Sequence, residues 1–232
     1  PPVCAIEERK VLDVNKIHFL LATIDDTKKL IKIIFDYLDN FRKEYLLESN
    51  EHLFKKLGHA NRWDSKEVRF IKLLLQTELK PRLRKKIIDK LFATYVTNDE
   101  VAFAEKLYVN IDQVKEMMTR KMYIGWHGNE HTRMSQLSNG DQDKEINQAS
   151  DFFDVIDSKN QSFIISYPYG DYSDSLINKL KKNNFDIGLT IKVGIAQLNK
   201  KNIFELPRLD TNDFPTEINA PPNKWVNKVR NG

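Results

Sequence analysis

The sequence has 232 residues, of which 41% are hydrophobic and 30% charged, and its formal net charge is +4. This length can bury one sizeable core, with or without an appended subdomain, and no apolar run approaches the roughly 18 to 20 residues that a membrane helix needs. The single cysteine, Cys4, excludes an internal disulfide and a cysteine-rich zinc site, so the fold requires no oxidising compartment.

The chain begins with PPVCAIEERK, which has neither an initiator Met nor the pattern of a signal peptide. Its two prolines are typical of the exit from an extended segment. We therefore expect the chain to be a fragment, with residues 1–10 as the remnant of a strand and turn.

Residues 11–118 show the apolar spacing of helices. One row recurs at i, i+3, i+4 and i+7 through Ile31, Ile34, Phe35, Leu38 and Phe41, and similar rows run through 83–91 and 107–118. Pro81 separates two periodic stretches, and TNDE at 97–100 is typical of a helix cap. We predict an all-helical module here, which shapes a substrate cleft, binds a partner or joins copies of the chain into a homo-oligomer.

A basic run, KPRLRKK, occupies residues 80–86. It would attract an anionic surface or polymer, and it equally suits an ordinary solvated helix face. No interleaved aromatic residues or nucleic-acid motif accompany it, so the sequence predicts no nucleic-acid partner.

After residue 120 the pattern changes to short apolar strands that alternate with polar helices. Strands are expected at 122–126, 162–167, 186–190 and 203–209, and helices at 142–157 and 173–182. This alternation predicts βα units around a parallel sheet or barrel over residues 119–232. Catalytic residues of such folds gather where strands end, which directs attention to His127.

His127 and His131 lie four positions apart, directly after the first of these strands. The helical zinc signature H-E-x-x-H does not fit, because Gly128 follows the first histidine and the glutamate is Glu130. A strand end followed by a glycine turn can bring both imidazoles to one point, as a zinc site requires. From composition alone, a metal pair and two neighbouring surface imidazoles both remain possible.

Two further stretches follow strands. Tyr167-Pro168-Tyr169-Gly170 is either a packed turn or part of a site. Arg208 and Asp210 fall on the same side of an extended segment, since strand side chains alternate, and they form either an ordinary salt bridge or a functional pair.

In this order, the three stretches resemble the motifs of the polysaccharide deacetylase family, the NodB-homology carbohydrate esterases. The family's H-[ST]-x-x-H motif corresponds to residues 127–131, and its R-x-P-Y-G motif to residues 167–170, although the arginine is absent. The segment PRLDTND looks like the family's fourth motif. The resemblance covers about residues 120–215.

The resemblance implies an α/β fold, a distorted (β/α) barrel of the NodB-homology type, with residues 11–118 as a large all-helical insertion. It also implies a metal-dependent hydrolase that removes acetyl groups from a carbohydrate, with a divalent ion, zinc by preference, held by His127 and His131. Tyr167, Pro168, Tyr169 and Gly170 would bind substrate, and Arg208 and Asp210 would orient and tune the catalytic base.

Two family motifs have no counterpart at the expected place. The first, T-F-D-D-G, supplies the base and an aspartate ligand and should precede Pro1; TIDDT at 23–27 imitates it, but Asp25 and Asp26 also suit a helix start. The last, Leu-x-His, is missing because no histidine follows His131. We expect this fragment to be inactive by itself.

Three functions remain open. The first is deacetylation of a polysaccharide or glycan precursor at N-acetyl or O-acetyl groups. The second is a catalytically silent carbohydrate-binding or scaffolding relative of the same fold. The third is another metal hydrolase, such as a phosphoesterase, that uses the same histidine pair. No role is predicted for the other histidines, which are His18, His52 and His59.

Overall fold

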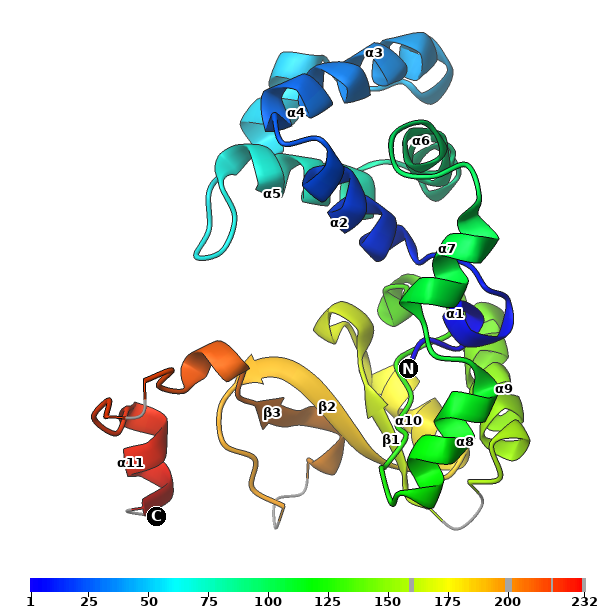
Figure 1. The fold of residues 1–232 in the computed structure, drawn as a ribbon, viewed down its shortest axis with the longest axis vertical. Helices are drawn as coiled ribbons and strands as arrows, with labels where there is room; N and C mark the ends of the chain where they lie inside the picture. Colours follow the sequence, from blue (N-terminus) through cyan, green and yellow to red (C-terminus); the bar gives the residue numbers. More distant parts are fainter. Residues whose placement is uncertain (159–160, 199–201, 218, 231–232) are drawn as a thin grey trace. The chain divides into compact units, whose positions relative to one another are not determined.

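The computed structural model of the chain describes residues 1–158, 161–198, 202–217 and 219–230. These residues form a mixed, mostly helical α/β fold with a small three-stranded parallel sheet. The chain divides into two compact units (Figure 1). The helical unit is Arg9–Tyr108, and the sheet unit is Pro1–Glu8 with Val109–Gly232.

The helical unit confirms the predicted helical spacing. Its elements are α2 (Asp13–Thr23), α3 (Thr27–Tyr45), α4 (Asn50–Leu57), α5 (Lys66–Leu73), a π-helical turn η1 (Leu74–Glu78), α6 (Pro81–Tyr95) and α7 (Glu100–Leu107). Ile31, Ile34 and Leu38 of α3 are buried in its core, as the periodicity predicts. The next helix, α8 (Ile111–Thr119), belongs to the sheet unit, so the helical unit ends before residue 118.

Polar residues start the helices of this unit where the sequence indicates them. The Asp26 carboxylate accepts hydrogen bonds from the backbone N–H groups of Lys28 and Lys29, at 2.9 and 3.2 Å, and so caps α3. Asp99 caps α7 through the N–H of Ala102 at 3.0 Å, within the predicted cap at 97–100. TIDDT therefore serves as a helix start.

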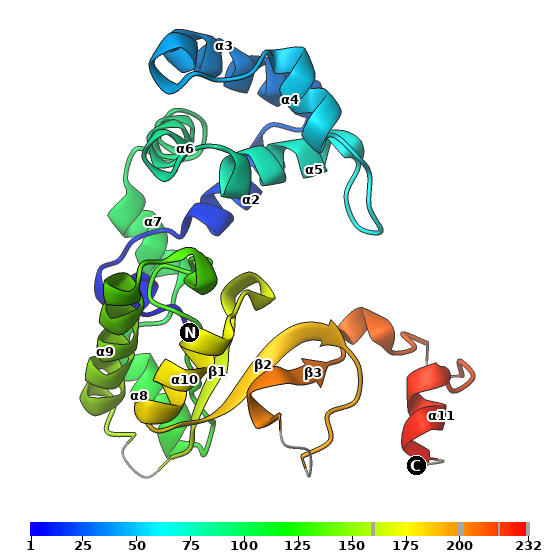
Figure 2. The ribbon, with the colours of Figure 1, turned by 180° about the vertical axis from the view of Figure 1, so that it is seen from behind.

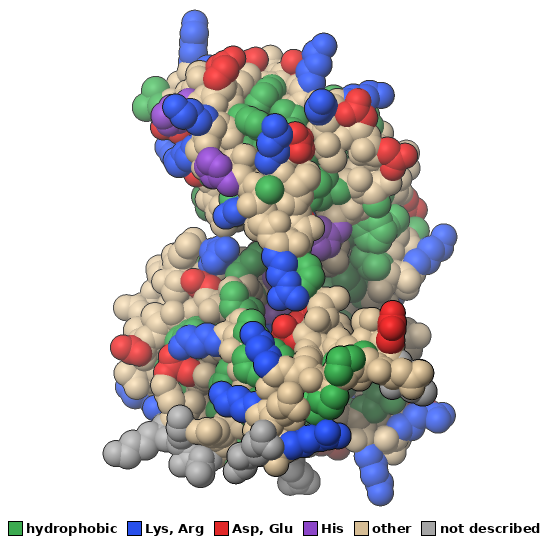
Figure 3. All heavy atoms as spheres, turned by 90° about the vertical axis from the view of Figure 1, so that its left-hand side faces the viewer, with side chains coloured by type: hydrophobic (Ala, Val, Ile, Leu, Met, Phe, Trp, Pro, Cys, Tyr) green, Lys and Arg blue, Asp and Glu red, His purple; other side chains and the backbone are tan. Residues whose placement is uncertain are grey.

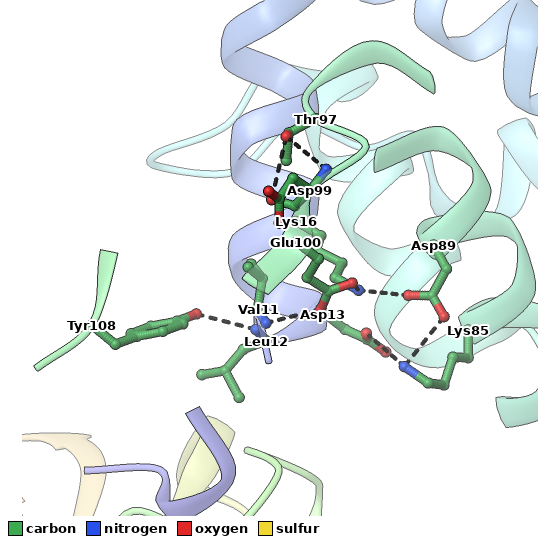
Figure 4. A network of polar contacts seen from close by, with 10 residues as sticks. All are labelled: Val11, Leu12, Asp13, Lys16, Lys85, Asp89, Thr97, Asp99, Glu100 and Tyr108. Atoms are coloured by element: carbon green, nitrogen blue, oxygen red, sulfur yellow. Dashed lines mark hydrogen bonds and ion pairs between the residues drawn. The ribbon is translucent and has the colours of Figure 1, made fainter. Parts of the chain in front are cut away.

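The first and last segments of the helical unit are joined to each other by hydrogen bonds (Figure 4). The N–H of Val11 donates to Glu100 at 3.0 Å, and the N–H of Leu12 donates to the Tyr108 hydroxyl at 3.1 Å. Closely spaced ends are what an inserted module needs, because such a module leaves and rejoins its host chain at one place.

A buried lysine lies at the centre of the same network. Lys16 is 1% exposed, and its ammonium group lies 2.7 Å from Asp89 and 2.8 Å from Glu100. Asp89 also pairs with Lys85 at 3.3 Å. Figure 4 shows these side chains converging from α2, α6 and α7, so a single cation links three helices.

The basic run at 80–86 is partly engaged in the fold. Lys85 pairs with Asp89, and Arg84 donates to the carbonyl of Gln76 at 2.6 Å. On the face drawn in Figure 3, basic side chains are interspersed with acidic ones. The pair of Lys85 with Asp89 and the bond of Arg84 to Gln76 favour the solvated-face interpretation of the run over an anion-binding stripe.

The sheet unit contains three parallel strands in the order β1 (Phe163–Ser166), β2 (Phe185–Val193) and β3 (Leu206–Arg208). Its helices are α1 (Val3–Glu7), α8, α9 (Asn139–Val155), α10 (Asp174–Lys182) and α11 (Lys224–Arg230), with short 3₁₀ turns at η2 (Met134–Gln136), η3 (Pro168–Gly170), η4 (Ile203–Glu205) and η5 (Thr211–Asp213). The predicted helices at 142–157 and 173–182 correspond to α9 and α10. The segment β1–α10–β2 is a βαβ unit, as the alternating pattern predicts.

The core of the sheet unit lies between the sheet and its helices. Figures 1 and 2 show α8, α9 and α10 beside β1. Phe152 of α9, Ile165 of β1, Leu176 of α10 and Phe185 of β2 are all buried in this core, together with Trp126. The three strands of the described residues form an open sheet and do not close into a barrel.

Three predicted strands differ in the structure. The segment 203–209 is a strand only over β3, because residues 203–205 form the 3₁₀ turn η4. Residues 122–126 form no strand: only Trp126 pairs, through a single parallel bridge to Ile165, because the chain turns away at His127. Residues 1–10 hold the short helix α1 in place of a strand, and its Val3–Ile6 side chains are buried, so apolar packing decides their conformation.

Among the residues that the structure describes, no helix has the length and apolar character needed to cross a membrane.

Candidate metal centre

The segment from His127 to His131 is a tight loop at the end of the Trp126 bridge. The N–H of His127 donates to the carbonyl of Pro1, and the N–H of Val3 donates to the carbonyl of Gly128, both at 3.2 Å. Gly128 has φ +75°, and a Cβ there would lie 3.1 Å from Pro168 Cγ. Glycine therefore suits the position at which the family motif has Ser or Thr.

The loop brings the two imidazoles together, as the sequence predicts. Their ring centroids lie 4.7 Å apart at an interplanar angle of 75°. His131 has φ +56°, a left-handed conformation that a non-glycine residue rarely adopts, so the loop holds this ring at the cost of backbone strain.

The Nδ1 atoms of the two histidines lie in different environments. Nδ1 of His127 lies 2.5 Å from the carbonyl oxygen of Ser166, so it carries the proton and leaves the lone pair on Nε2. Nδ1 of His131 is buried with no hydrogen-bond partner in the structure. A backbone carbonyl on one ring nitrogen is the usual support for a histidine that ligates metal through the other.

Burial keeps both imidazoles neutral. Burial lowers the pKa of His127, and the positive charge of Arg208 lowers it further. Burial, followed by the neighbouring His127, lowers the pKa of His131 to about 4. Neutral imidazole is the form that binds zinc, so both rings are in the ligating form at neutral pH.

The described residues bring two candidate ligands together and no third. They contain no group of three or more His, Cys, Asp and Glu side chains that could hold a metal ion. The pair therefore fits part of a zinc site, and a complete site would need a further donor.

In the turn at 167–170, Tyr167 and Pro168 are buried in the core, and Tyr169 lies beside the histidine pair. Tyr167 is 1% exposed and its hydroxyl donates to the carbonyl of Phe204 at 3.1 Å, so its side chain serves the core and lies away from solvent. Pro168 is also buried. Tyr169, at φ +56°, places its ring centroid 4.7 Å from that of His131. A Cβ at Gly170 would lie 2.3 Å from Ile191 Cγ1, which leaves room only for glycine.

Arg208 is the last residue of β3, Asp210 follows the strand, and both are exposed. Nε of Arg208 donates to the carbonyl of Thr190 at 2.9 Å, and its charge reaches His127. Asp210 accepts the N–H of Asn212 at 2.8 Å and caps η5. In the structure Arg208 is thus hydrogen-bonded to β2, and Asp210 has a local capping contact.

Sequence reasoning missed Glu145. Its side chain comes from α9, is 8% exposed, and accepts the N–H of Asn129 inside the histidine loop at 2.7 Å. Burial raises the pKa of this carboxyl. The available signal in the sequence was a glutamate directly before Ile146, on the apolar stripe of a helix. Charged residues are rarely buried there unless they have a partner.

Comparison with known proteins places this geometry in a family. The polysaccharide deacetylase model matches residues 87–188, which include both histidines and the turn at 167–170. Over residues 87–188, this chain matches a polysaccharide deacetylase family domain. The match begins within α6 and ends within β2, so Arg208 and Asp210 lie outside it.

Similar proteins cover the deacetylase domain in part. The putative polysaccharide deacetylase YxkH of Bacillus subtilis (strain 168) is 27% identical over 95 residues, which are 41% of this chain and 34% of the relative. A structure of the Streptococcus pyogenes deacetylase PplD in complex with acetate is 24% identical with a TM-score of 0.42, over 53% of this chain and 50% of that chain. The chain thus spans about a third of the curated relative and about half of the solved chain.

Acid should destabilise the metal-free protein partly through His131. Its folded-state pKa of about 4 lies below the ordinary 6.5, so between these values the unfolded state binds more protons. The stabilisation that neutral His131 provides is therefore fully present above the ordinary pKa of 6.5. It decreases as the pH falls toward the folded-state pKa of about 4. We expect His131→Gln to lose less stability than the unaltered protein between about pH 7.5 and about pH 5, in urea unfolding with a chelator present. An equal loss in both proteins would contradict this pKa.

Removing the Glu145 carboxylate should loosen the histidine loop. Glu145→Leu leaves the buried N–H of Asn129 without an acceptor, which costs about 1–3 kcal/mol, whereas Glu145→Gln retains an oxygen and should cost less. Glu116→Leu on α8 is the control, because that side chain is 60% exposed and should change stability by only about 0.5 kcal/mol. Urea unfolding of the three variants measures these differences, and a Leu variant as stable as the control would contradict the role of Glu145.

Proposed function

We propose that this chain is part of a metal-dependent deacetylase that removes N-acetyl or O-acetyl groups from a polysaccharide or glycan precursor. The observation that carries the proposal is the histidine pair: two imidazoles in ring contact, neutral at physiological pH, within the region that the family model matches. Among the common catalytic metals, zinc is the ion that a site with two neutral imidazoles favours.

In this proposal His127 and His131 are two metal ligands, with His127 binding through Nε2. The chemistry that zinc would supply when held there is polarisation of the acetyl carbonyl and a lowering of the pKa of bound water to about 7. The Ser166 carbonyl fixes the tautomer of His127, and the strained loop fixes the direction of His131. The protein's own contribution is thus to present two preformed, desolvated donors.

The turn at 167–170 is proposed to line the substrate. Support comes from Tyr169, whose half-buried ring contacts that of His131. The backbone N–H of Tyr169 is proposed to donate to the tetrahedral oxyanion, a contribution worth about 3 kcal/mol in comparable sites. Tyr167 and Pro168 support the turn from the core, and Gly170 allows its close approach to β2.

Arg208 and Asp210 are proposed to orient and tune the catalytic base. Arg208 supports this role through its electrostatic effect on His127. Asp210 lies two residues further along, where it caps η5. The base itself and the third metal ligand must come from outside the group of described residues that surround the pair.

We also propose that the sheet is part of a distorted (β/α) barrel with the helical unit as an insertion. Three parallel strands and a βαβ unit support the barrel, and the Trp126 bridge extends the pairing beyond β1. The joined ends of the helical unit support the insertion. A contact between copies of the chain through this unit remains part of the proposal.

The alternative is a catalytically silent carbohydrate-binding relative. The observation that favours it is the two-ligand set, because a catalytic zinc site has three protein ligands and the described residues supply two.

Acetate release distinguishes these functions. The protein is incubated with zinc and oligomers of N-acetylglucosamine, and acetate is measured with and without a chelator. Chelator-sensitive release from the full-length protein supports the deacetylase. Saturable oligomer binding without release, in a full-length protein that binds zinc, contradicts it and supports the silent relative.

A further inference from the structure

Buried polar atoms without partners cluster immediately after the histidine pair. Nδ1 of His131, Oγ1 of Thr132 and Nε of Arg133 are each buried and make no hydrogen bond in the structure. Buried polar atoms are almost always satisfied in folded proteins, and each exception calls for an explanation. His131 is already a candidate metal ligand, so the two neighbouring donors, Thr132 Oγ1 and Arg133 Nε, indicate a place where a second ligand can accept hydrogen bonds.

Arg133 is the charged member of this cluster. Its guanidinium carbon lies 4.7 Å from the centroid of the Tyr169 ring, and the same ring contacts His131 at 4.7 Å. The Tyr169 ring therefore contacts both Arg133 and His131, which is one of the two candidate metal ligands. It is half-buried, so its guanidinium is partly removed from water.

No carboxylate neutralises this arginine among the described residues. The carboxylate bonded to the same segment, that of Asp171, accepts the N–H of Ser135 at 2.8 Å. The only side-chain interaction of Arg133 among the described residues is its contact with the Tyr169 ring. A half-buried cation without a counter-ion is costly, and an anionic ligand would offset that cost.

The contact of the Arg133 guanidinium with the Tyr169 ring favours an anion with two oxygens. A guanidinium that packs its face on an aromatic ring keeps its in-plane N–H groups available at the edge. Those N–H groups match carboxylate and phosphate oxygens in a bidentate arrangement, and the Thr132 hydroxyl can add a further donor.

We propose that Thr132, Arg133 and Tyr169 form an anion-binding subsite that takes a carboxylate or phosphate group of the glycan, next to the sugar that carries the acetyl group. The identification of the anion as part of a glycan rests on the proposed deacetylase function. The subsite makes the substrate an acidic glycan and makes Arg133 a residue that determines specificity.

Binding by the metal-free protein tests the subsite separately from catalysis. The probes are a neutral trimer of N-acetylglucosamine, the matched trimer with a uronate neighbour, and the matched trimer with a phosphorylated neighbour, titrated calorimetrically in the presence of a chelator. We expect at least one acidic trimer to bind about tenfold more tightly than the neutral one, and the two acidic arms show which anion is preferred.

Three substitutions locate the effect. Arg133→Gln should reduce the preference to about twofold or less while the affinity for the neutral trimer is unchanged, and Arg133→Lys should retain part of it, since a lysine keeps the charge without the fork. Arg62→Gln is the matched control, because Arg62 also lies over an aromatic ring, at 4.1 Å from that of Trp63, in the helical unit. This control should keep the full preference.

Equal binding of all three trimers by the unaltered protein would overturn the proposal. Arg133→Gln weakening neutral and acidic trimers by the same factor would also overturn it, because Arg133 would then only support the turn. Acetate release from the neutral trimer by the full-length protein tests the deacetylase separately. An acidic preference without any acetate release would leave the subsite in place and contradict the proposed function alone.

Discussion

His127→Ala and His131→Ala should each lower the zinc affinity of the protein by about a hundredfold or more. Losing a direct ligand costs more than losing the outer hydrogen bonds that orient ligands, and those already cost about 10–100-fold. Both rings are predicted to contribute because they lie in contact, 4.7 Å apart, with lowered pKa values. Zinc titration against a chromophoric chelator measures the affinities.

His52→Ala is the control for these variants. This imidazole is 61% exposed in the helical unit and lies 3.3 Å from Glu48, so its removal should leave zinc affinity unchanged. The unaltered chain should itself bind zinc more weakly than a three-ligand site, because two neutral imidazoles offer no carboxylate charge to offset the ion. Zinc affinity that survives both histidine substitutions would contradict the candidate metal centre.

The double substitution Asp89→Asn/Glu100→Gln should destabilise the helical unit by about 3–5 kcal/mol, the usual cost of leaving a buried charge unpaired. Lys16 is 1% exposed and both of its carboxylate partners would be lost together (Figure 4). Hydrogen exchange of α2 and α6 reports on this unit without interference from the sheet unit.

Lys16→Met in the same background should restore most of the loss, because an apolar side chain of similar length replaces the unpaired ammonium. Glu78→Gln is the control: its pair with Lys56 is more exposed, so its loss should change stability far less than the double substitution does. A double variant as stable as this control would show that the Lys16 network does not stabilise the unit.

The sequence by itself determined the features that depend on local periodicity. Apolar residues spaced at i, i+3 and i+4 predict the helix α3, and Pro81 and Asp99 mark the starts of α6 and α7. The spacing of His127, Gly128 and His131 also indicated that the two rings could meet, because these residues lie within five consecutive positions.

The family was also accessible from sequence, since motif order and spacing are properties of the linear chain. The roles within a motif were not equally accessible. Tyr167 and Tyr169 differ by two positions, yet one hydroxyl is buried against Phe204 and the other ring contacts His131. The left-handed turn at Tyr169 decides this difference, and residue type alone does not predict it.

Only the tertiary structure decided which residues, far apart in the sequence, meet at the candidate metal centre. Glu145 reaches Asn129 from α9, and Arg133 meets Tyr169 across more than thirty residues of sequence. The assignment of α8 to the sheet unit and the incomplete ligand set are likewise tertiary facts. Such contacts depend on how helices and strands pack, and packing brings together side chains whose separation along the chain carries no periodic signal.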